Sequence, residues 1–320
     1  MSSPTPDKPK LGISACLMGV EVRFNGGHKE SHLCTRALSE YFDFIPLCPE
    51  VAIGMGIPRE PIRLVGDPEA PQAVGTVNSE LNVTQALADY GTRMADEVSD
   101  ICGYIFMQKS PSCGLERVKV YRENGAPVDG GGRGIYAQAF CAAHPNLPVE
   151  EDGRLNDAVL RENFITRVFA YAAWQDVLKT GVTRRALTEF HSRYKYQLMA
   201  NNPVQYKVLG NMLGSMGRSD PEEIAPLYFT ELMAALKKCA TRSTHTNVLQ
   251  HLTGYLKQTI SAQDKQEIQQ LIAQYHQGIV PLIVPLTLLK HHFRQHPDPY
   301  VALQVYMQPH PENLSLRNAI

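Results

Sequence analysis

The chain has 320 residues, of which 43% are hydrophobic and 20% charged, and its formal net charge is −1. This length and composition are typical of a globular protein with two domains, and no apolar run is long enough to cross a bilayer. The polar, proline-rich start of the sequence has no apolar segment behind its lysines, which is not typical of a signal peptide. We therefore expect a cytoplasmic protein without a membrane partner.

The first half of the chain alternates short apolar segments with helical patterns. Strands are predicted at 11–17, 43–51 and 103–109, each ending in a polar loop, and nearer a sheet edge at 117–121. Helices are predicted at 31–42 and 82–100, the second with Thr84 as N-cap, and after the glycine-rich loop 125–134. This order predicts an α/β domain with a mainly parallel sheet over residues 1–155.

The character of the sequence changes at about residue 156. Apolar residues recur at three- and four-residue spacing over 160–178, 184–200, 202–216, 227–240, 245–260 and 264–278. This spacing predicts an all-α domain over residues 156–320. Residues 151–320 carry 18 basic and 14 acidic side chains, against 13 and 18 in residues 1–150. A modest basic excess is compatible with a polyanionic partner, although most such excesses are simply a solvated surface.

The seven cysteines are unevenly distributed, because six of them precede residue 142. An odd number of thiols in a chain without an export signal argues against a disulfide framework. Cys16 ends the first predicted strand, Cys48 ends the second, and Cys113 lies in the loop after the third. The carboxyl ends of parallel strands share one edge, with neighbours roughly 5 Å apart, so we expect these three thiols to converge.

Thiolates select zinc, copper(I) or iron–sulfur clusters, and the chain lacks the CxxC pairs of a structural zinc site. Three cysteines with an open position suit a catalytic cluster. Any one of them alone is better explained as a small buried hydrophobe, which is how we interpret Cys34, Cys102 and Cys141.

Polar residues near the three cysteines are candidates for catalysis. Glu50 follows Cys48 by two residues, and no basic residue lies nearer to it in sequence than Arg59. Its carboxyl group is therefore either an acid or base at an apolar sheet edge or a cap of the following turn. Ser110 and Ser112 either hydrogen-bond a substrate or cap a turn.

The segment "RFNGGHK" offers Arg23, Asn25 and the backbone at Gly26 to an anion or a base edge. A glycine pair such as this one is more often a plain turn.

Three segments, "SACLMGVEVRFNGG", "PLCPEVAIGMGIPREP" and "KSPSCG", together resemble the thiouracil desulfurase family. The resemblance implies a four-iron four-sulfur (4Fe-4S) cluster with one iron that no protein residue ligates. By motif position its ligands are Cys16, Cys48 and Cys113, and the catalytic residues are Glu50 and Ser110. Asn25 stands where the family usually has a carboxylate, which leaves that position a hydrogen-bonding role.

The second half resembles the YbgA-like domain through "EFHSRYKYQLMA", "NVLQHLTGYLK" and "GIVPLIVPLTLLKHH". The fused arrangement is similar to proteins that desulfurate thiouridine, in particular 4-thiouridine in tRNA, with the helical half binding RNA. Basic side chains contact phosphate and aromatic rings stack on bases in such complexes, which suggests His191, Lys195, His251 and Lys257. The alternative is that the aromatic rings belong to the core and the lysines face solvent.

The two resemblances thus imply a desulfidase that replaces the thiocarbonyl sulfur of a thiolated uracil or uridine by oxygen, with the cluster as a Lewis acid. The foremost expected substrate is 4-thiouridine in nucleotides or tRNA. The sequence leaves open whether the substrate is a thiolated nucleobase, a nucleotide or tRNA, and it does not fix the oligomeric state. One alternative is a non-enzymatic iron–sulfur redox sensor with a nucleic-acid-binding helical domain. Another is a free-base desulfurase whose helical domain only mediates self-association.

Overall fold

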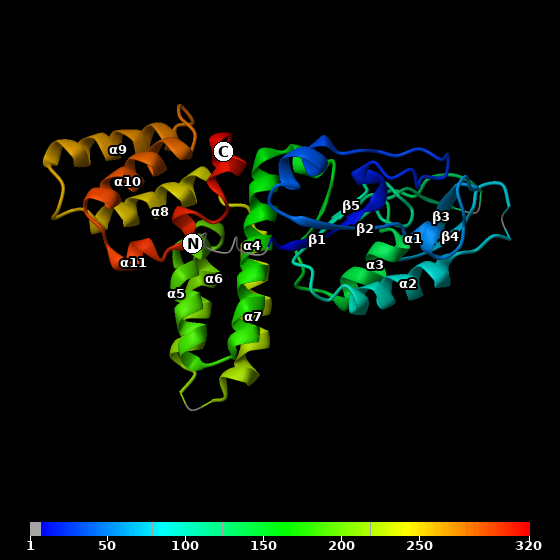
Figure 1. Cartoon of the computed structure of the whole chain (residues 1–320), viewed down its shortest axis with the longest axis horizontal. Coiled ribbons are helices and arrows are strands. Elements are labelled where there is room, and N and C mark those ends of the chain that lie inside the picture. Colours follow the sequence, from blue (N-terminus) through cyan, green and yellow to red (C-terminus); the bar gives the residue numbers. More distant parts are fainter. Residues whose placement is uncertain (1–7, 79, 123, 218) are drawn as a thin grey trace, which may run out of the picture. The chain divides into compact units, whose positions relative to one another are not determined.

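The computed structural model describes residues 8–78, 80–122, 124–217 and 219–320. The chain divides into two compact units, the first ending at Asn156 and the second beginning at Asp157 (Figure 1). The first unit contains the strands and the second is helical, so the predicted fold classes are confirmed.

The main sheet of the first unit is parallel, in the strand order β2-β1-β5-β7. Its strands are β1 (Lys10–Ser14), β2 (Asp43–Leu47), β5 (Tyr104–Phe106) and β7 (Val149–Glu151). Ser14 pairs with Leu47, and Ile13 pairs with Ile105. The register therefore places the carboxyl ends of β2, β1 and β5 side by side.

A second, smaller sheet has the order β4-β3-β6. Its strands are β3 (Ile62–Asp67), β4 (Ala70–Gly75) and β6 (Val120–Tyr121). The antiparallel pair β3–β4 was not predicted, because its short apolar segments are interrupted by glycine and proline. The strand predicted at 117–121 is shortened to two residues and is an edge strand of this second sheet.

Helices α2 (Thr84–Glu97) and α3 (Ile135–Ala143) lie side by side in the first unit (Figure 1). Gly91 permits this approach, since a Cβ there would lie 2.8 Å from the carbonyl oxygen of Tyr136. The prediction that Thr84 is the N-cap is wrong: Val83 occupies that position, and the Thr84 hydroxyl accepts a hydrogen bond from the Ala73 backbone N–H.

Four short helical segments are described in this unit: 3₁₀ helices at Ala15–Met18 and Arg154–Asn156, a π-helix at Leu33–Leu38, and α1 (Pro49–Ala52). The π-helix occupies the region predicted as an ordinary helix at 31–42.

The second unit contains α4 (Ala158–Thr180), α5 (Arg184–Asn201), α6 (Pro203–Gly214), α7 (Pro221–Lys237), α8 (Arg242–Tyr255), α9 (Ala262–His276), α10 (Ile283–Gln295) and α11 (Pro299–Ala302). Side-chain caps begin several of them; the Asp157 carboxylate, for example, accepts hydrogen bonds from two backbone N–H groups of α4. Across the described ranges, no helix has both the length and the apolar character needed to span a membrane.

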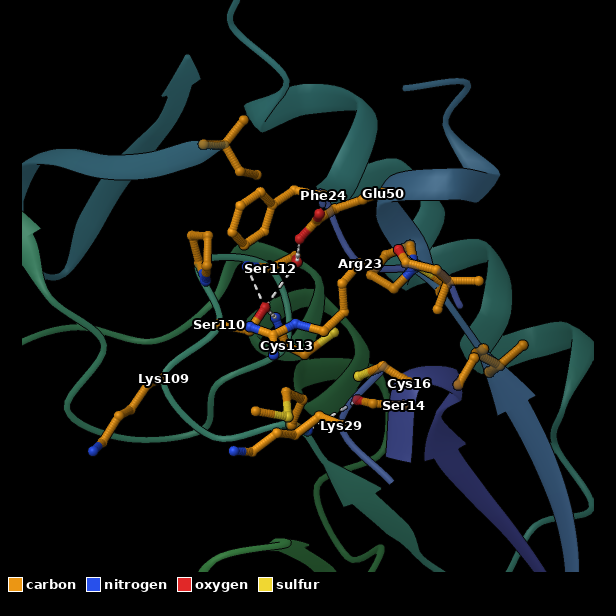
Figure 2. A pocket seen from close by; sticks show the side chains of 18 of the residues that line it. Ser14, Cys16, Arg23, Phe24, Lys29, Glu50, Lys109, Ser110, Ser112 and Cys113 are labelled. Carbon is orange, nitrogen blue, oxygen red and sulfur yellow. Dashed lines mark hydrogen bonds between the residues drawn. The ribbon is translucent and has the colours of Figure 1, made fainter. Parts of the chain in front are cut away.

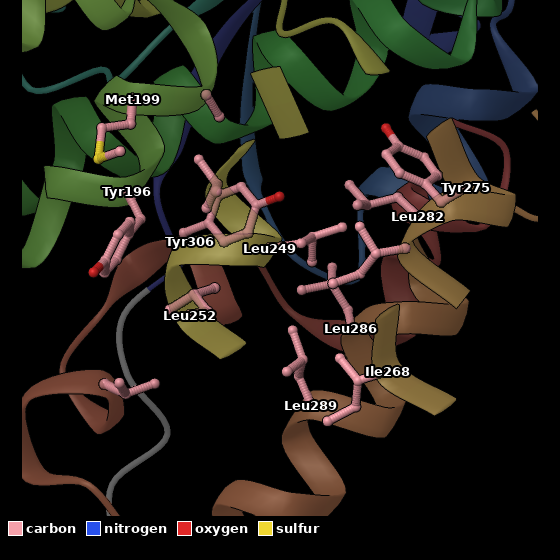
Figure 3. Close-up of a cluster of buried hydrophobic side chains, with 14 of the residues drawn as sticks. Tyr196, Met199, Leu249, Leu252, Ile268, Tyr275, Leu282, Leu286, Leu289 and Tyr306 are labelled. Atoms are coloured by element: carbon pink, nitrogen blue, oxygen red, sulfur yellow. The ribbon is translucent and has the colours of Figure 1, made fainter. Parts of the chain in front are cut away.

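The hydrophobic core shown in Figure 3 joins α5, α8, α9 and α10 to the segment after α11. Leu249 and Leu252 of α8 are fully buried against Ile268, Leu286 and Tyr306. Apolar residues on one face of each helix therefore meet in a single cluster.

Leu249→Ala should lower the free energy of unfolding of the second unit by about 2–5 kcal/mol, because it leaves a cavity in this core. Trp174, the only tryptophan of the chain, is buried in α4, so its fluorescence in urea reports unfolding of this unit. Val204→Ala is the control, since Val204 is 72% exposed. This substitution should change the free energy of unfolding by less than about 0.5 kcal/mol. Equal values for the two variants would contradict the assignment of this core.

Candidate active site

Cys16, Cys48 and Cys113 line one cavity of about 440 Å³ at the carboxyl edge of the main sheet. Cys16 lies in the 3₁₀ helix that follows β1, Cys48 directly follows β2, and Cys113 lies in the loop after β5. These strands are neighbours in the order β2-β1-β5, which is why positions far apart in sequence meet here. Figure 2 shows Cys16 and Cys113 among the side chains that line the cavity.

The three thiols share a buried environment and are close enough to influence one another. Burial, and to a smaller extent the neighbouring Cys48 thiolate, raise the pKa of Cys16 to about 11. Burial is also the main cause of the raised pKa values of Cys48 and Cys113. Thiols in such a site are protonated at neutral pH unless a bound group stabilises the thiolates.

The other cysteines of the first unit, all within its described residues, are not part of the cavity wall. Cys34 is fully buried in the π-helix, and Cys102 is buried just before β5. Cys141 lies in α3.

Glu50 lies in α1 and forms a buried ion pair with Arg59. The Arg59 Nε and Nη2 atoms donate to the Glu50 Oε2 at 2.8 and 2.5 Å. The side chains of Arg59 and Glu50 are only 4% and 15% exposed. Arg59, the basic residue nearest to Glu50 in sequence, is thus also its partner in space, because the loop after α1 turns through Gly54 and Gly56, both with positive φ, and returns Arg59 to the carboxylate.

Ser110 and Ser112 connect this carboxylate to the cysteine loop (Figure 2). The Ser112 hydroxyl donates to the Glu50 Oε1 and lies 3.1 Å from the Ser110 Oγ. The Ser110 Oγ accepts from the backbone N–H groups of Ser112 and Cys113 at 3.3 and 3.1 Å. Ser112 is fully buried, so its hydroxyl lies between Glu50 and Ser110.

Besides Arg59, three basic residues line the cavity: Arg23, Lys29 and Lys109. The Arg23 guanidinium lies 5.9 Å from the centre of the Phe24 ring. Among the described residues, none of the three side chains has an ion-pair or hydrogen-bond partner. Arg23 was singled out from the sequence, whereas Lys29 and Lys109 were missed, although Lys109 belongs to the quoted "KSPSCG" motif.

Asn25 and Gly26 are not among the residues of the cavity wall. The Asn25 side-chain oxygen accepts from the Gly27 N–H, and Gly26 has a φ of 75°. Both residues thus shape the turn that follows Arg23.

The four candidate RNA-binding residues occupy different environments. The His191 Nδ1 atom lies 3.2 Å from the Tyr228 hydroxyl oxygen, and burial lowers the pKa of His191. The Lys195 ammonium lies over the rings of Tyr196 and Tyr300. His251, in α8, and Lys257, just after it, are exposed to solvent. His191 thus has the environment of a packing residue, and the RNA-binding role of all four stays a prediction.

Comparison with known proteins places the chain in a family. Residues 11–152 match the family model of 2-thiouracil desulfurase, and residues 195–311 match a model described as a protein of unknown function, DUF1722. The uncharacterized protein YbgA of Escherichia coli (strain K12) is 30% identical over 159 residues, which cover 49% of this chain and 94% of YbgA. In one half the chain thus belongs to the YbgA-like family, and it joins this part to a 2-thiouracil desulfurase domain.

Two further proteins resemble part of this fused chain. The uncharacterized protein YbbK of Bacillus subtilis (strain 168) is 28% identical over 151 residues, which cover 45% of this chain and 97% of YbbK. The solved structure of the [4Fe-4S]-dependent thiouracil desulfidase TudS is 25% identical, with a TM-score of 0.35, and the match covers 47% of this chain and 94% of that one.

The thiol of Cys34 provides a test of the buried environment. Burial raises its pKa to about 11, and its sulfur has no exposed surface that a reagent could reach in the folded chain. Its ionisation is therefore followed by the ultraviolet absorbance of the thiolate, as the difference between the wild-type chain and Cys34→Ser. This difference should still be rising at about pH 10, whereas N-acetylcysteine in the same buffers should level off above its pKa of about 8.5. A plateau near about pH 9 would contradict the raised pKa.

Proposed function

We propose that the first unit replaces the thiocarbonyl sulfur of a thiolated uracil by oxygen, and that its substrate is 4-thiouridine in a nucleotide or in tRNA. The observation that carries this proposal is one cavity holding three thiols, the Glu50 carboxylate and the Ser110–Ser112 pair, in a chain of the 2-thiouracil desulfurase family.

The thiols of Cys16, Cys48 and Cys113 fit an iron–sulfur group by the chemistry of the donor set. Sulfur donors select soft metals, and three of them line a cavity wide enough for a cluster. Over the described residues, no group of three or more His, Cys, Asp or Glu side chains is arranged to hold a single metal ion. A 4Fe-4S cluster held by the three cysteines, with one iron free of protein ligands, suits this arrangement. When bound, it would supply a soft Lewis acid that polarises the thiocarbonyl bond.

The surrounding residues would handle protons and orient the base. The reaction adds the oxygen of one water to the ring carbon and releases the sulfur as hydrogen sulfide, so both protons of the water are transferred and no electrons are. Glu50 would accept and return a proton at Oε1, the oxygen that meets the Ser112 hydroxyl. The Ser110 hydroxyl, whose oxygen is held by two backbone N–H groups, would turn its single proton from Ser112 to the uracil ring and so orient the ring.

The charge of the cavity favours a substrate that carries phosphate. Arg59 neutralises Glu50, whereas Arg23, Lys29 and Lys109 have no ion-pair or hydrogen-bond partner in the described residues. A cluster held by three thiolates would offset part of their positive charge, and a nucleotide or an RNA backbone would supply the rest, which a neutral free base would not. In the second unit, exposed His251 and Lys257 remain candidates for contacts with RNA.

The decisive experiment uses the full chain, purified anaerobically and reconstituted with iron and sulfide. It is incubated with 4-thiouridine-containing tRNA, with 4-thiouridine 5′-monophosphate and with 2-thiouracil. Loss of the thiocarbonyl absorbance and release of sulfide measure turnover. We expect turnover of the tRNA or the nucleotide. Turnover of 2-thiouracil alone would contradict the substrate assignment, and no turnover by an intact cluster would favour an iron–sulfur redox sensor instead.

Cys113→Ser should remove most of the bound iron, because it deletes one of three ligands, whereas Cys34→Ser should retain it. Iron and acid-labile sulfide per chain, with the visible spectrum of the reconstituted protein, provide the measurement. Cys34 is the matched control, since it is a buried thiol of the same unit that lies outside the cavity wall. Equal iron content in the two variants would refute the ligand assignment.

Lys29→Met should raise the KM for 4-thiouridine 5′-monophosphate about tenfold, because it removes one charge-assisted contact worth ~1.4 kcal/mol. The KM for 2-thiouracil should stay within about twofold. Lys119→Met is the control, since Lys119 is an exposed lysine of the same unit that is not part of the cavity wall. If Lys29→Met changed both KM values alike, the phosphate-binding role of Lys29 would be ruled out.

A further inference from the structure

Both oxygens of the Glu50 carboxylate are engaged by buried partners. Arg59 donates twice to Oε2, and the Ser112 hydroxyl donates to Oε1. We propose that Arg59 is a positioning residue, which together with Ser112 fixes the Glu50 carboxylate in the cavity wall so that its Oε1 faces the Ser112–Ser110 pair. This inference rests on the proposed catalytic function of Glu50.

The Arg59 side chain is oriented by the backbone independently of Glu50. Its Nη1 donates to the Gly56 carbonyl oxygen at 3.0 Å, and its Nη2 donates to the Val22 carbonyl oxygen at 2.8 Å. The guanidinium is planar, so these two bonds set the direction in which Nε and Nη2 present their remaining N–H groups. That direction meets the Glu50 Oε2, and a lysine has no such rigid fork.

The serine side of the carboxylate is equally constrained. Ser112 has no exposed surface, and a Cβ on Gly134 would lie 2.5 Å from its carbonyl oxygen, so the loop packs tightly there. The single hydroxyl proton of Ser112 is directed to Glu50, which leaves the Ser112 Oγ to accept from the Ser110 hydroxyl 3.1 Å away. The Ser110 hydroxyl is thus the group at the outer end of the chain Glu50–Ser112–Ser110.

A purely structural role for Arg59 makes a different prediction. Arg59 also links the segment after β1 to the loop after α1, through Val22 and Gly56. If this link were its only role, its loss would lower thermal stability and would affect activity equally whether or not Glu50 were present. A positioning residue loses its effect on kcat once the residue that it positions is removed.

The test is a double-mutant cycle in the reconstituted full-length protein, with Arg59→Gln, Glu50→Gln and both together. Assays use 4-thiouridine 5′-monophosphate and 2-thiouracil in parallel. Arg59→Gln should lower kcat about 100-fold with KM within about threefold, as expected when a reacting group is misplaced by about 1 Å. In the Glu50→Gln background the same substitution should lower kcat by less than about twofold. Arg63→Gln, an arginine of β3 outside the cavity wall, is the control for loss of charge and should keep kcat.

Arg59→Lys should recover part of kcat, because an ammonium can still bind one carboxylate oxygen. If Arg59→Gln fails to fold, Arg59→Lys replaces it in the double-mutant cycle. Iron and sulfide content, and the thermal unfolding temperature of the metal-free variants, are measured alongside. Three results would overturn the positioning role while leaving the role of Glu50 intact. These are an equal loss of kcat with and without Glu50→Gln, an effect of Arg59→Gln on KM alone, and an unchanged kcat. A fully active Glu50→Gln would instead overturn the proposed catalytic function, and the inference with it.

Discussion

The candidate site depends on the parallel register of β2, β1 and β5. Each of these strands ends at the same edge of the sheet, and each is followed by a cysteine within a few residues. A parallel arrangement is required, because antiparallel neighbours would place alternate carboxyl ends at opposite edges. Tyr136 and Phe140 of α3 pack against Tyr104 and Phe106 of β5, which stabilises this sheet and therefore the spacing of the thiols.

The second constraint is the charge balance of a largely buried site. Taking a carboxylate and a guanidinium out of water is costly unless each is paired and hydrogen-bonded, and the Arg59–Glu50 pair meets that condition with two backbone carbonyl oxygens and a serine hydroxyl. The basic residues of the site thus fall into two groups, one paired with a carboxylate and one not. Arg59 is enclosed and contacts the carboxylate, whereas Arg23, Lys29 and Lys109 have no ion-pair or hydrogen-bond partner among the described residues.

The helical unit illustrates how similar sequence patterns acquire different roles. His191 and Lys195 follow one another by a single turn of α5, yet His191 contacts a buried tyrosine and Lys195 lies against two aromatic rings. His251 and Lys257 belong to a comparable pattern and are exposed. Spacing along a helix identifies the shared face, but the neighbouring helices decide whether that face is covered.

The sequence by itself determined the two fold classes and the position of the three cysteines at successive strand ends, because apolar periodicity and chain order are local properties. It also indicated most helices of the second half. In the first half it did not predict that Leu33–Leu38 is a π-helix, that β3 and β4 pair, or that Val83 is the N-cap of α2. Only the tertiary structure decided the surroundings of Glu50. Arg59 is nine residues from it and Ser112 sixty-two, and the glycine turns and packed loops that bring them together depend on contacts that no local pattern records. The spacing of hydrophobic residues determines where helices and strands form. The partners of a buried charge depend on how those helices and strands pack together in the folded chain.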